Sequence, residues 1–331
     1  DVLQDDLDLL LDSPSSLTLT SNTRGTVKEK AGFKVEEDVA ALRKAIEGIG
    51  TTEKTLIGVL TQRSDAQRQL ISRAYEKATG RKLVADLEGD THGDFEDLLV
   101  ALATPLSVFD CHEVMKAMKG AGTTESTLTE IFASRSNKQI KGLSDVYLKE
   151  TGRELIHDLK SEVSGDYGEA LLILAEVPYG KIKPRCDAAL YEAGEKKWGT
   201  DEKKFIDILC HRSVPQLRQT LVEYKNVSKK TLQESIESEM SGDLEKLLVA
   251  VVKCVKNTPA FLAELLFKSM KGAGTTESVL TRILVSRSEI DLLDIRAEYK
   301  KLFGRSLYSE LESEVSGNYG EALKMLCGQD D

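Results

Sequence analysis

The chain of 331 residues lacks any apolar run of roughly 18 residues, the length that a helix needs to cross a bilayer. Aromatic residues make up only 5% of the sequence and there are six prolines, while apolar residues reach 40%. These apolar residues recur with helical rather than alternating spacing, which predicts an all-α protein.

Disulfide and zinc signals are also absent, because the five cysteines lie far apart and form no CxxC pair. The first residues, DVLQDDLDLLLD, lack the positive start and cleavage site of a secretory signal, so we expect a cytoplasmic protein. The formal net charge of −10 argues against a nucleic-acid partner. It also opposes contact with an anionic membrane unless a cation lies between them.

The sequence does contain one loop in four copies. KGAGTTES stands at residues 119–126 and 271–278, with altered copies at 47–54 and 196–203. We therefore predict four units at 33–104, 105–176, 177–257 and 258–331, after a tail at 1–32 that we expect to be mobile. Each unit has about 70 residues, which leaves room for about five short helices.

Two further residue patterns repeat behind each loop. Apolar residues follow the i, i+3, i+4 spacing of a helix that faces a core, as at Leu128, Ile131 and Phe132. An arginine then follows in every unit, where we expect it to meet the C-terminal carbonyls of that helix. These arginines are Arg63, Arg135, Arg212 and Arg287.

An acidic residue lies at a constant distance from each loop. The same 42 residues separate Gly48 from Asp90, Gly120 from Glu162, Lys197 from Glu239 and Gly272 from Glu314. Each acid precedes a glycine and an apolar helix, so we place it in a turn before that helix. Ca²⁺ prefers carbonyl and carboxylate oxygens, and glycines with positive φ can turn successive carbonyls toward one point. The pattern predicts calcium sites with open positions for a lipid phosphate oxygen.

The glycines and acids also admit other interpretations. A dinucleotide fingerprint fails because Glu125 stands at the third glycine position, and neither a phosphate loop nor an EF-hand is present. For a single loop, glycines as helix C-caps and acids as partners of a helix N-terminus explain the residues well. Independent caps have no reason to keep one offset in four copies, which favours a shared ligand.

Two other functional classes remain as alternatives. One is a calcium-independent helical scaffold that binds a protein partner through the leucine-rich tail. The other is a hydrolase, but no histidine falls in a recurrent position beside a nucleophile or an acid pair, so we expect no enzyme. The histidines are His92, His112, His157 and His211.

The repeated motifs resemble the annexin family over residues 33–331. KGAGTTE and KWGTDE, each with its distal acid, look like the type II calcium sites of that family, and VSRSEIDLLDIRAEY and LCGQDD are annexin-like. Within the family the third vertebrate type is the most similar. The resemblance implies four five-helix units in a curved disc, whose convex face holds Ca²⁺ against anionic, phosphatidylserine-like phospholipid. It further implies a monomer in solution that assembles laterally on membranes.

The resemblance also assigns the site residues. The carbonyl donors and acids are Ile46, Gly48, Gly50 and Asp90; Met118, Gly120, Gly122 and Glu162; Gly194, Lys197, Gly199 and Glu239; and Met270, Gly272, Gly274 and Glu314. Weak secondary ions are expected at Thr51 with Glu53, Thr123 with Glu125 and Thr275 with Glu277, and lipid contacts at Trp198, Lys119 and Lys271.

Departures from the family pattern carry expectations of their own. Glu47 replaces the lysine of the second and fourth loops, and Asp90 is shorter than glutamate, so we expect the first site to be weaker. Four residues match polar positions at the centre of the family's disc, where we expect buried salt bridges between units. They are Asp110, Glu113, Arg135 and Arg282.

Overall fold

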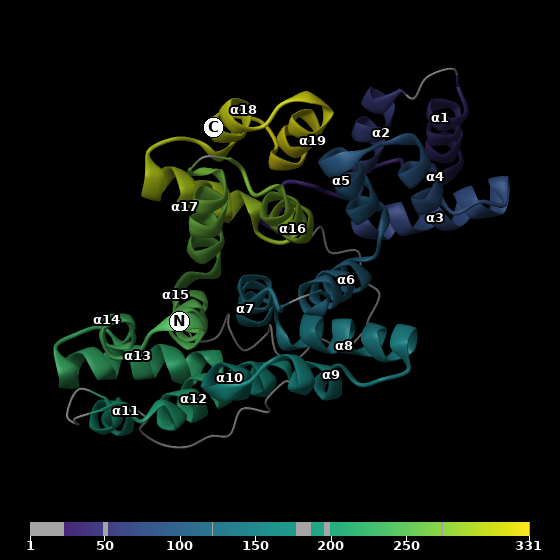
Figure 1. The fold of residues 1–331 in the computed structure, drawn as a ribbon. Coiled ribbons are helices and arrows are strands. Elements are labelled where there is room, and N and C mark those ends of the chain that lie inside the picture. The colour runs from purple at the N-terminus through teal and green to yellow at the C-terminus, as the bar shows by residue number, and fades with distance from the viewer. Residues whose placement is uncertain are drawn as a thin grey trace.

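The computed structural model describes residues 23–48, 52–120, 122–176, 187–194, 199–272 and 274–330. These ranges are helical and contain no strand, which confirms the all-α prediction (Figure 1). The first module contains α1 (Val35–Glu47), α2 (Glu53–Leu60), α3 (Asp65–Thr79), α4 (Leu83–Asp90) and α5 (Gly93–Ala103). The second contains α6 (Leu106–Met118), α7 (Glu125–Ser134), α8 (Asn137–Thr151), α9 (Leu155–Glu162) and α10 (Gly165–Ala175).

The third and fourth modules share one long helix. The third contains α11 (Asp187–Ala193), α12 (Glu202–His211), α13 (Val214–Ser228) and α14 (Leu232–Glu239). The fourth contains α16 (Glu277–Arg287), α17 (Leu292–Phe303), α18 (Leu307–Glu314) and α19 (Gly317–Cys327). Between them, α15 (Gly242–Met270) is kinked at Asn257, whose φ of −165° and ψ of 92° are not helical. Its two halves complete five helices in each module, as predicted.

Local signals in the sequence set the ends of the third helix of the first module. Ser64 and Gln67 form a capping box at the start of α3, and Gly80 ends the helix in the left-handed region at φ 70°. The Thr79 hydroxyl accepts a hydrogen bond of 3.1 Å from the Arg81 backbone N–H. This turn fixes the backbone from which the Arg81 side chain projects.

The four modules lie as four lobes around a centre, and they share two hydrophobic cores (Figure 1). One core joins the first and fourth modules, where α5 packs on α16 and α2 on α19. The other joins the second and third, where α10 packs on α12. The stripe residues predicted behind each loop are fully buried in these cores, which supports the helical spacing read from the sequence. They are Leu56, Leu128, Phe205 and Leu280.

A buried ion-pair network connects the two cores across the centre. Arg282 of α16 donates hydrogen bonds of 2.5 and 3.0 Å to Glu130 of α7 and one of 2.8 Å to Glu113 of α6. This contact between the fourth and second modules agrees with the expected salt bridges between units. The other expected pair, Arg135 with Asp110, instead lies within the second module.

The repeated arginines have a different role from the one we expected. Arg63 donates to both carboxylate oxygens of Asp38, at 2.7 and 2.8 Å, and Arg135 does the same with Asp110, at 2.8 and 2.9 Å. Each pair joins the first helix of a module to the end of its second helix. In the fourth module Arg287 pairs with Asp291 instead. Arg63, Arg135 and Arg287 therefore form buried ion pairs rather than acting chiefly on helix-end carbonyls. Arg212 differs, because it lies 3.7 Å from Asp207, whose side chain is 46% exposed.

The residues that lead into the first module cross to the fourth. The Val27 N–H donates to Ser288 O and the Leu293 N–H to Arg24 O, both at 2.9 Å. Gly25 lies so close that a Cβ there would be 2.5 Å from the Glu289 carbonyl carbon, so a larger residue does not fit. Residues 23–30, which we expected to belong to a mobile tail, therefore hold a fixed position. Residues 1–22 lie outside the described part of the chain.

Candidate metal centre

Each candidate loop connects the first and second helices of a module and is closed by a backbone hydrogen bond across its base. In the second and fourth modules this bond runs from Thr124 N to Ala117 O and from Thr276 N to Ser269 O, both at 2.8 Å. The corresponding bonds are Thr52 N to Ala45 O at 3.2 Å and Asp201 N to Ala193 O at 2.9 Å. The last bond spans one residue more than the others, so the third loop is one residue longer.

The second and fourth loops share one backbone conformation. Gly120 and Gly272 have φ values of 114° and 115°, and Gly122 and Gly274 have values of 152° and 138°. A Cβ at any of these positions would meet nothing within 4 Å, so packing does not require glycine there. The requirement is conformational, which is what carbonyls aimed at a common point need.

The first loop departs from this conformation, whereas in the third Gly199 keeps a positive φ, of 84°. In the first, α1 continues through Glu47 and Gly48 has a φ of −70°, so the Gly48 carbonyl is not directed by a positive φ as in the second and fourth loops. In the third, a Cβ on Gly194 would lie 3.0 Å from the ring of Phe205, so close packing accounts for this glycine. The expected ligands Gly50 and Lys197, Thr51 of a secondary site and the lipid-contact residue Trp198 lie outside the described residues.

The distal acids do not lie in a turn, as we expected, but form the last residue of the fourth helix of each module. These residues are Asp90, Glu162, Glu239 and Glu314. A negative side chain is unfavourable at this end because the helix dipole is negative there. None of the four acids forms an ion pair with another described residue, and none is buried. Four unpaired acids in an unfavourable position are the arrangement that a bound cation stabilises.

Loop and acid come into contact in two modules. The Thr123 hydroxyl donates to the Glu162 backbone carbonyl at 3.2 Å, and the Thr200 hydroxyl donates to the Glu239 carboxylate at 2.9 Å. These bonds bring together elements that are about half a module apart in sequence. The N-cap positions of the helices that follow these two acids are held by Ser164 and Ser241, not by the acids themselves.

Two tyrosines that sequence reasoning missed help to set the constant offset. The Tyr167 hydroxyl donates to Glu125 O at 3.1 Å, and the Tyr319 hydroxyl donates to Glu277 O at 2.9 Å. Each bond ties the first residue behind the loop to the helix that follows the acid, again over 42 residues. The repetition of a tyrosine 42 residues after the first residue behind the loop could have predicted this contact from the sequence. Part of the fixed spacing is thus a packing requirement of the fold.

The secondary sites have a simpler explanation for their acids. Glu53, Glu125 and Glu277 are each the first residue of the helix behind the loop. A carboxylate at a helix N-terminus is stabilised by the dipole without any metal. The partner Thr123 donates its hydroxyl to Glu162, as described above.

The donor set is suited to a hard cation. Within the described ranges, no three His, Cys, Asp or Glu side chains cluster as a metal site. The donors predicted for the second and fourth modules are backbone carbonyls and the carboxylate of the distal acid, which are donors that Ca²⁺ accepts, whereas structural zinc sites use Cys and His. The residues present fit Ca²⁺ at the second and fourth modules, where loop conformation and exposed acid agree.

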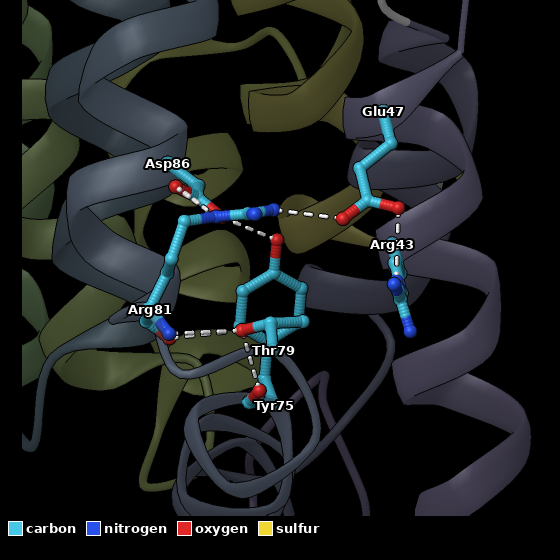
Figure 2. A network of polar contacts seen from close by, with 6 residues as sticks. All are labelled: Arg43, Glu47, Tyr75, Thr79, Arg81 and Asp86. Carbon is cyan, nitrogen blue, oxygen red and sulfur yellow. Dashed lines mark hydrogen bonds and ion pairs between the residues drawn. The ribbon is translucent and has the colours of Figure 1, made fainter.

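Charged residues beside the loops differ between modules. Lys119 is exposed at the second loop, and the Lys271 ammonium lies 4.5 Å from the centre of the Phe267 ring at the fourth. At the first loop, Glu47 accepts hydrogen bonds of 2.8 Å from Arg81 and 2.9 Å from Arg43 (Figure 2). Both bonds stabilise the Glu47 carboxylate and lower its pKa, and the bond from Arg81 has the larger effect. Sequence reasoning missed this network.

The annexin family model matches the chain four times, at residues 37–102, 109–174, 186–251 and 261–326. Annexin A3 of Bos taurus and of Homo sapiens are each 51% identical over 93% of this chain and 98% of their own length. A solved structure of annexin III superimposes with a TM-score of 0.90, at 51% identity over 93% of this chain and 98% of its own. A calcium-bound structure of annexin (Sm)1 has a TM-score of 0.82, at 34% identity over 93% and 94%.

Annexins bind phospholipid membranes in a calcium-dependent manner. In the part of the chain that the structure describes, no helix has the length and apolar character to span a membrane. Four matched repeats, five helices in each and the agreement with solved annexin structures lead to one conclusion: this chain belongs to the annexin family.

Proposed function

We propose that this protein binds anionic phospholipid membranes reversibly through Ca²⁺, and that it acts without catalysis. The proposal rests on one observation above the others: an acid that is exposed or only partly buried ends the fourth helix of every module, and none of these acids has an ion-pair partner among the described residues. In the second module, Thr123 of the loop that carries Gly120 and Gly122 donates a hydrogen bond to the backbone carbonyl of Glu162. The loop carbonyls and the Glu162 carboxylate would hold the ion and leave positions open for a lipid phosphate oxygen.

The net charge gives calcium a second role. At −10 the chain is repelled by an anionic surface, and a divalent cation at each loop would make that face locally positive. Calcium and membrane should therefore strengthen each other's binding by the same factor. Four modest sites acting together also give higher avidity than one. We place the protein in the cytoplasm and on membranes when calcium rises, with a role in membrane organisation, trafficking or aggregation.

The test is sedimentation with phosphatidylserine-containing vesicles, in calcium and then in chelator. The wild-type chain should pellet with vesicles in calcium only; equal pelleting in both would favour a calcium-independent scaffold. The double variant Glu162→Gln and Glu314→Gln removes two candidate ligand charges and should need several-fold more calcium. Glu312→Gln is the matched control, because Glu312 lies on the same helix as Glu314 and its side chain is 63% exposed. If the double variant behaves like this control, the two acids are not ligands.

A further inference from the structure

We propose that Glu47 is a latch on the first loop, and that this latch makes the first module take part in calcium-dependent membrane binding after the second and fourth modules. The latch is the ion pair between Glu47, at the end of α1, and Arg81, which lies two residues before α4 and pairs with Asp86 of that helix (Figure 2). It joins the helix that leads into the loop to the helix that ends in Asp90. The inference rests on the proposed function and names a residue that sets one module apart.

The arginine side of the latch is held in place by three contacts. Its Nε donates to both carboxylate oxygens of Asp86, at 2.9 and 3.1 Å, and the Thr79 turn fixes its backbone. Asp86 in turn accepts a hydrogen bond of 2.6 Å from the Tyr75 hydroxyl. Glu47 therefore meets a guanidinium that is already oriented, and Arg43, one turn earlier on α1, holds its second oxygen.

The second and fourth modules have the same arginine but cannot form the latch. Arg153 pairs with Asp158 at 2.9 Å and Arg305 with Glu310 at 3.3 Å, as Arg81 does with Asp86. The residues that correspond to Glu47 are Lys119 and Lys271, which carry the same charge as the arginine. Among the first, second and fourth modules, whose loop stems the structure describes, the cross-link between loop stem and acid-bearing helix is thus a property of the first.

The backbone of the loop differs in the same module. Where the stem residue is lysine, the helix ends one residue earlier and the next glycine takes a φ of 114° or 115°. Where it is Glu47, the residue stays helical and Gly48 has a φ of −70°. The latched stem and the departure from the carbonyl-directing conformation occur together.

The latch also changes the charge that the loop presents. Arg43 and Arg81 are balanced by Glu47 and Asp86, so the four groups cancel (Figure 2). At the second loop, the two positive charges of Lys119 and Arg153 are opposed by the single negative charge of Asp158, so the net charge of these three groups is +1. An anionic membrane is therefore attracted to the second loop more than to the first.

The experiment compares Glu47→Gln and Glu47→Lys with wild type in the full chain. We would measure the calcium concentration at which half of the protein sediments with vesicles of phosphatidylserine and phosphatidylcholine. Glu47→Gln should lower this midpoint by a factor of about two to five, the range that exposed ion pairs reach. Glu47→Lys should lower it further. Glu37→Gln and Glu37→Lys are the matched controls, since Glu37 lies at the other end of α1 and forms an exposed pair with Lys34.

The reciprocal variant transfers the latch. Lys119→Glu places a carboxylate opposite Arg153 and should raise the calcium midpoint. A second measurement needs neither calcium nor vesicles: amide hydrogen exchange of the peptides that span 44–56 and 116–128. Exchange of the first peptide should be faster in Glu47→Gln, and exchange of the second slower in Lys119→Glu, because the ion pair is lost in one and gained in the other.

The outcomes separate the latch from the proposed function. If wild type does not sediment with vesicles in calcium, the proposed function fails, while the exchange measurement still tests the latch. If wild type binds but Glu47→Gln changes neither the midpoint nor the exchange, the latch is wrong. A lower midpoint in Glu47→Lys alone, with unchanged exchange in both variants, would show that surface charge acts without a latch and would overturn the inference.

Discussion

The buried network at Arg282 predicts the largest single loss of stability in this chain. Arg282 and Glu130 are 3% and 4% exposed, and Glu113 is 16% exposed. Burial lowers the pKa of Arg282, but the two carboxylates outweigh this effect and raise the pKa above its usual value. Arg282→Met would leave Glu130 charged, buried and without its cation. Removing one partner of a buried pair costs about 3–5 kcal/mol.

The assay is urea unfolding followed by circular dichroism, with the free energy taken from midpoint and slope. Lys34→Gln is the surface control, because Lys34 and Glu37 are each 68% exposed and such a pair contributes at most about 1 kcal/mol. The double variant Arg282→Met and Glu130→Leu should recover part of the loss, since it removes the uncompensated charge. If Arg282→Met costs no more than the surface control, the network does not stabilise the junction between the two cores.

Two further predictions concern helix starts and buried phenols. Asp201 caps α12 by accepting a hydrogen bond from Lys204 N at 3.3 Å, whereas Thr124 and Thr276 make no such bond, so Thr124→Asp and Thr276→Asp should each stabilise the protein by about 0.5–1 kcal/mol in thermal melts. Asp201→Ala should instead lower the melting temperature. Equal melting temperatures for wild type and all three variants would contradict this prediction. Burial raises the pKa of Tyr75 and of Tyr167 to about 12 from 10.0. The contribution of these two neutral phenols to the free energy of unfolding is fully present below pH 10 and is lost as the pH rises toward 12. If the absorbance of ionised tyrosine at 295 nm reaches its full value near pH 10 while the protein is still folded, this prediction is wrong.

The modules and their helices were predictable because they depend on local patterns. Spacing at Leu128, Ile131 and Phe132 marks a buried helix face, and all three residues lie in the core. The loop and acid were found through their repetition. How the modules pair was not predictable, because the contact of α5 with α16 joins residues that are far apart in the chain and leaves no periodic signal.

Side-chain partners account for most of the differences between sequence and structure. The repeated arginine could be seen at once, but its acid lies 25 residues earlier on another helix, at Asp38 for Arg63 and at Asp110 for Arg135. In the fourth module Leu262 occupies the corresponding position, and Arg287 turns to Asp291. A repeat that keeps the arginine while exchanging its partner indicates that the buried cation is required at the helix junction.

The same reasoning limits what repetition says about function. Tyr167 and Tyr319 show that a fixed offset between loop and distal helix also follows from packing, so the spacing alone does not require a ligand. The position of the acids is the stronger observation. Packing gives no reason for a carboxylate at the negative end of the helix in all four modules, exposed or only partly buried and without an ion pair among the described residues. A positively charged group from solvent would make that placement favourable, and a hard cation is the kind that the proposed loop carbonyls would bind.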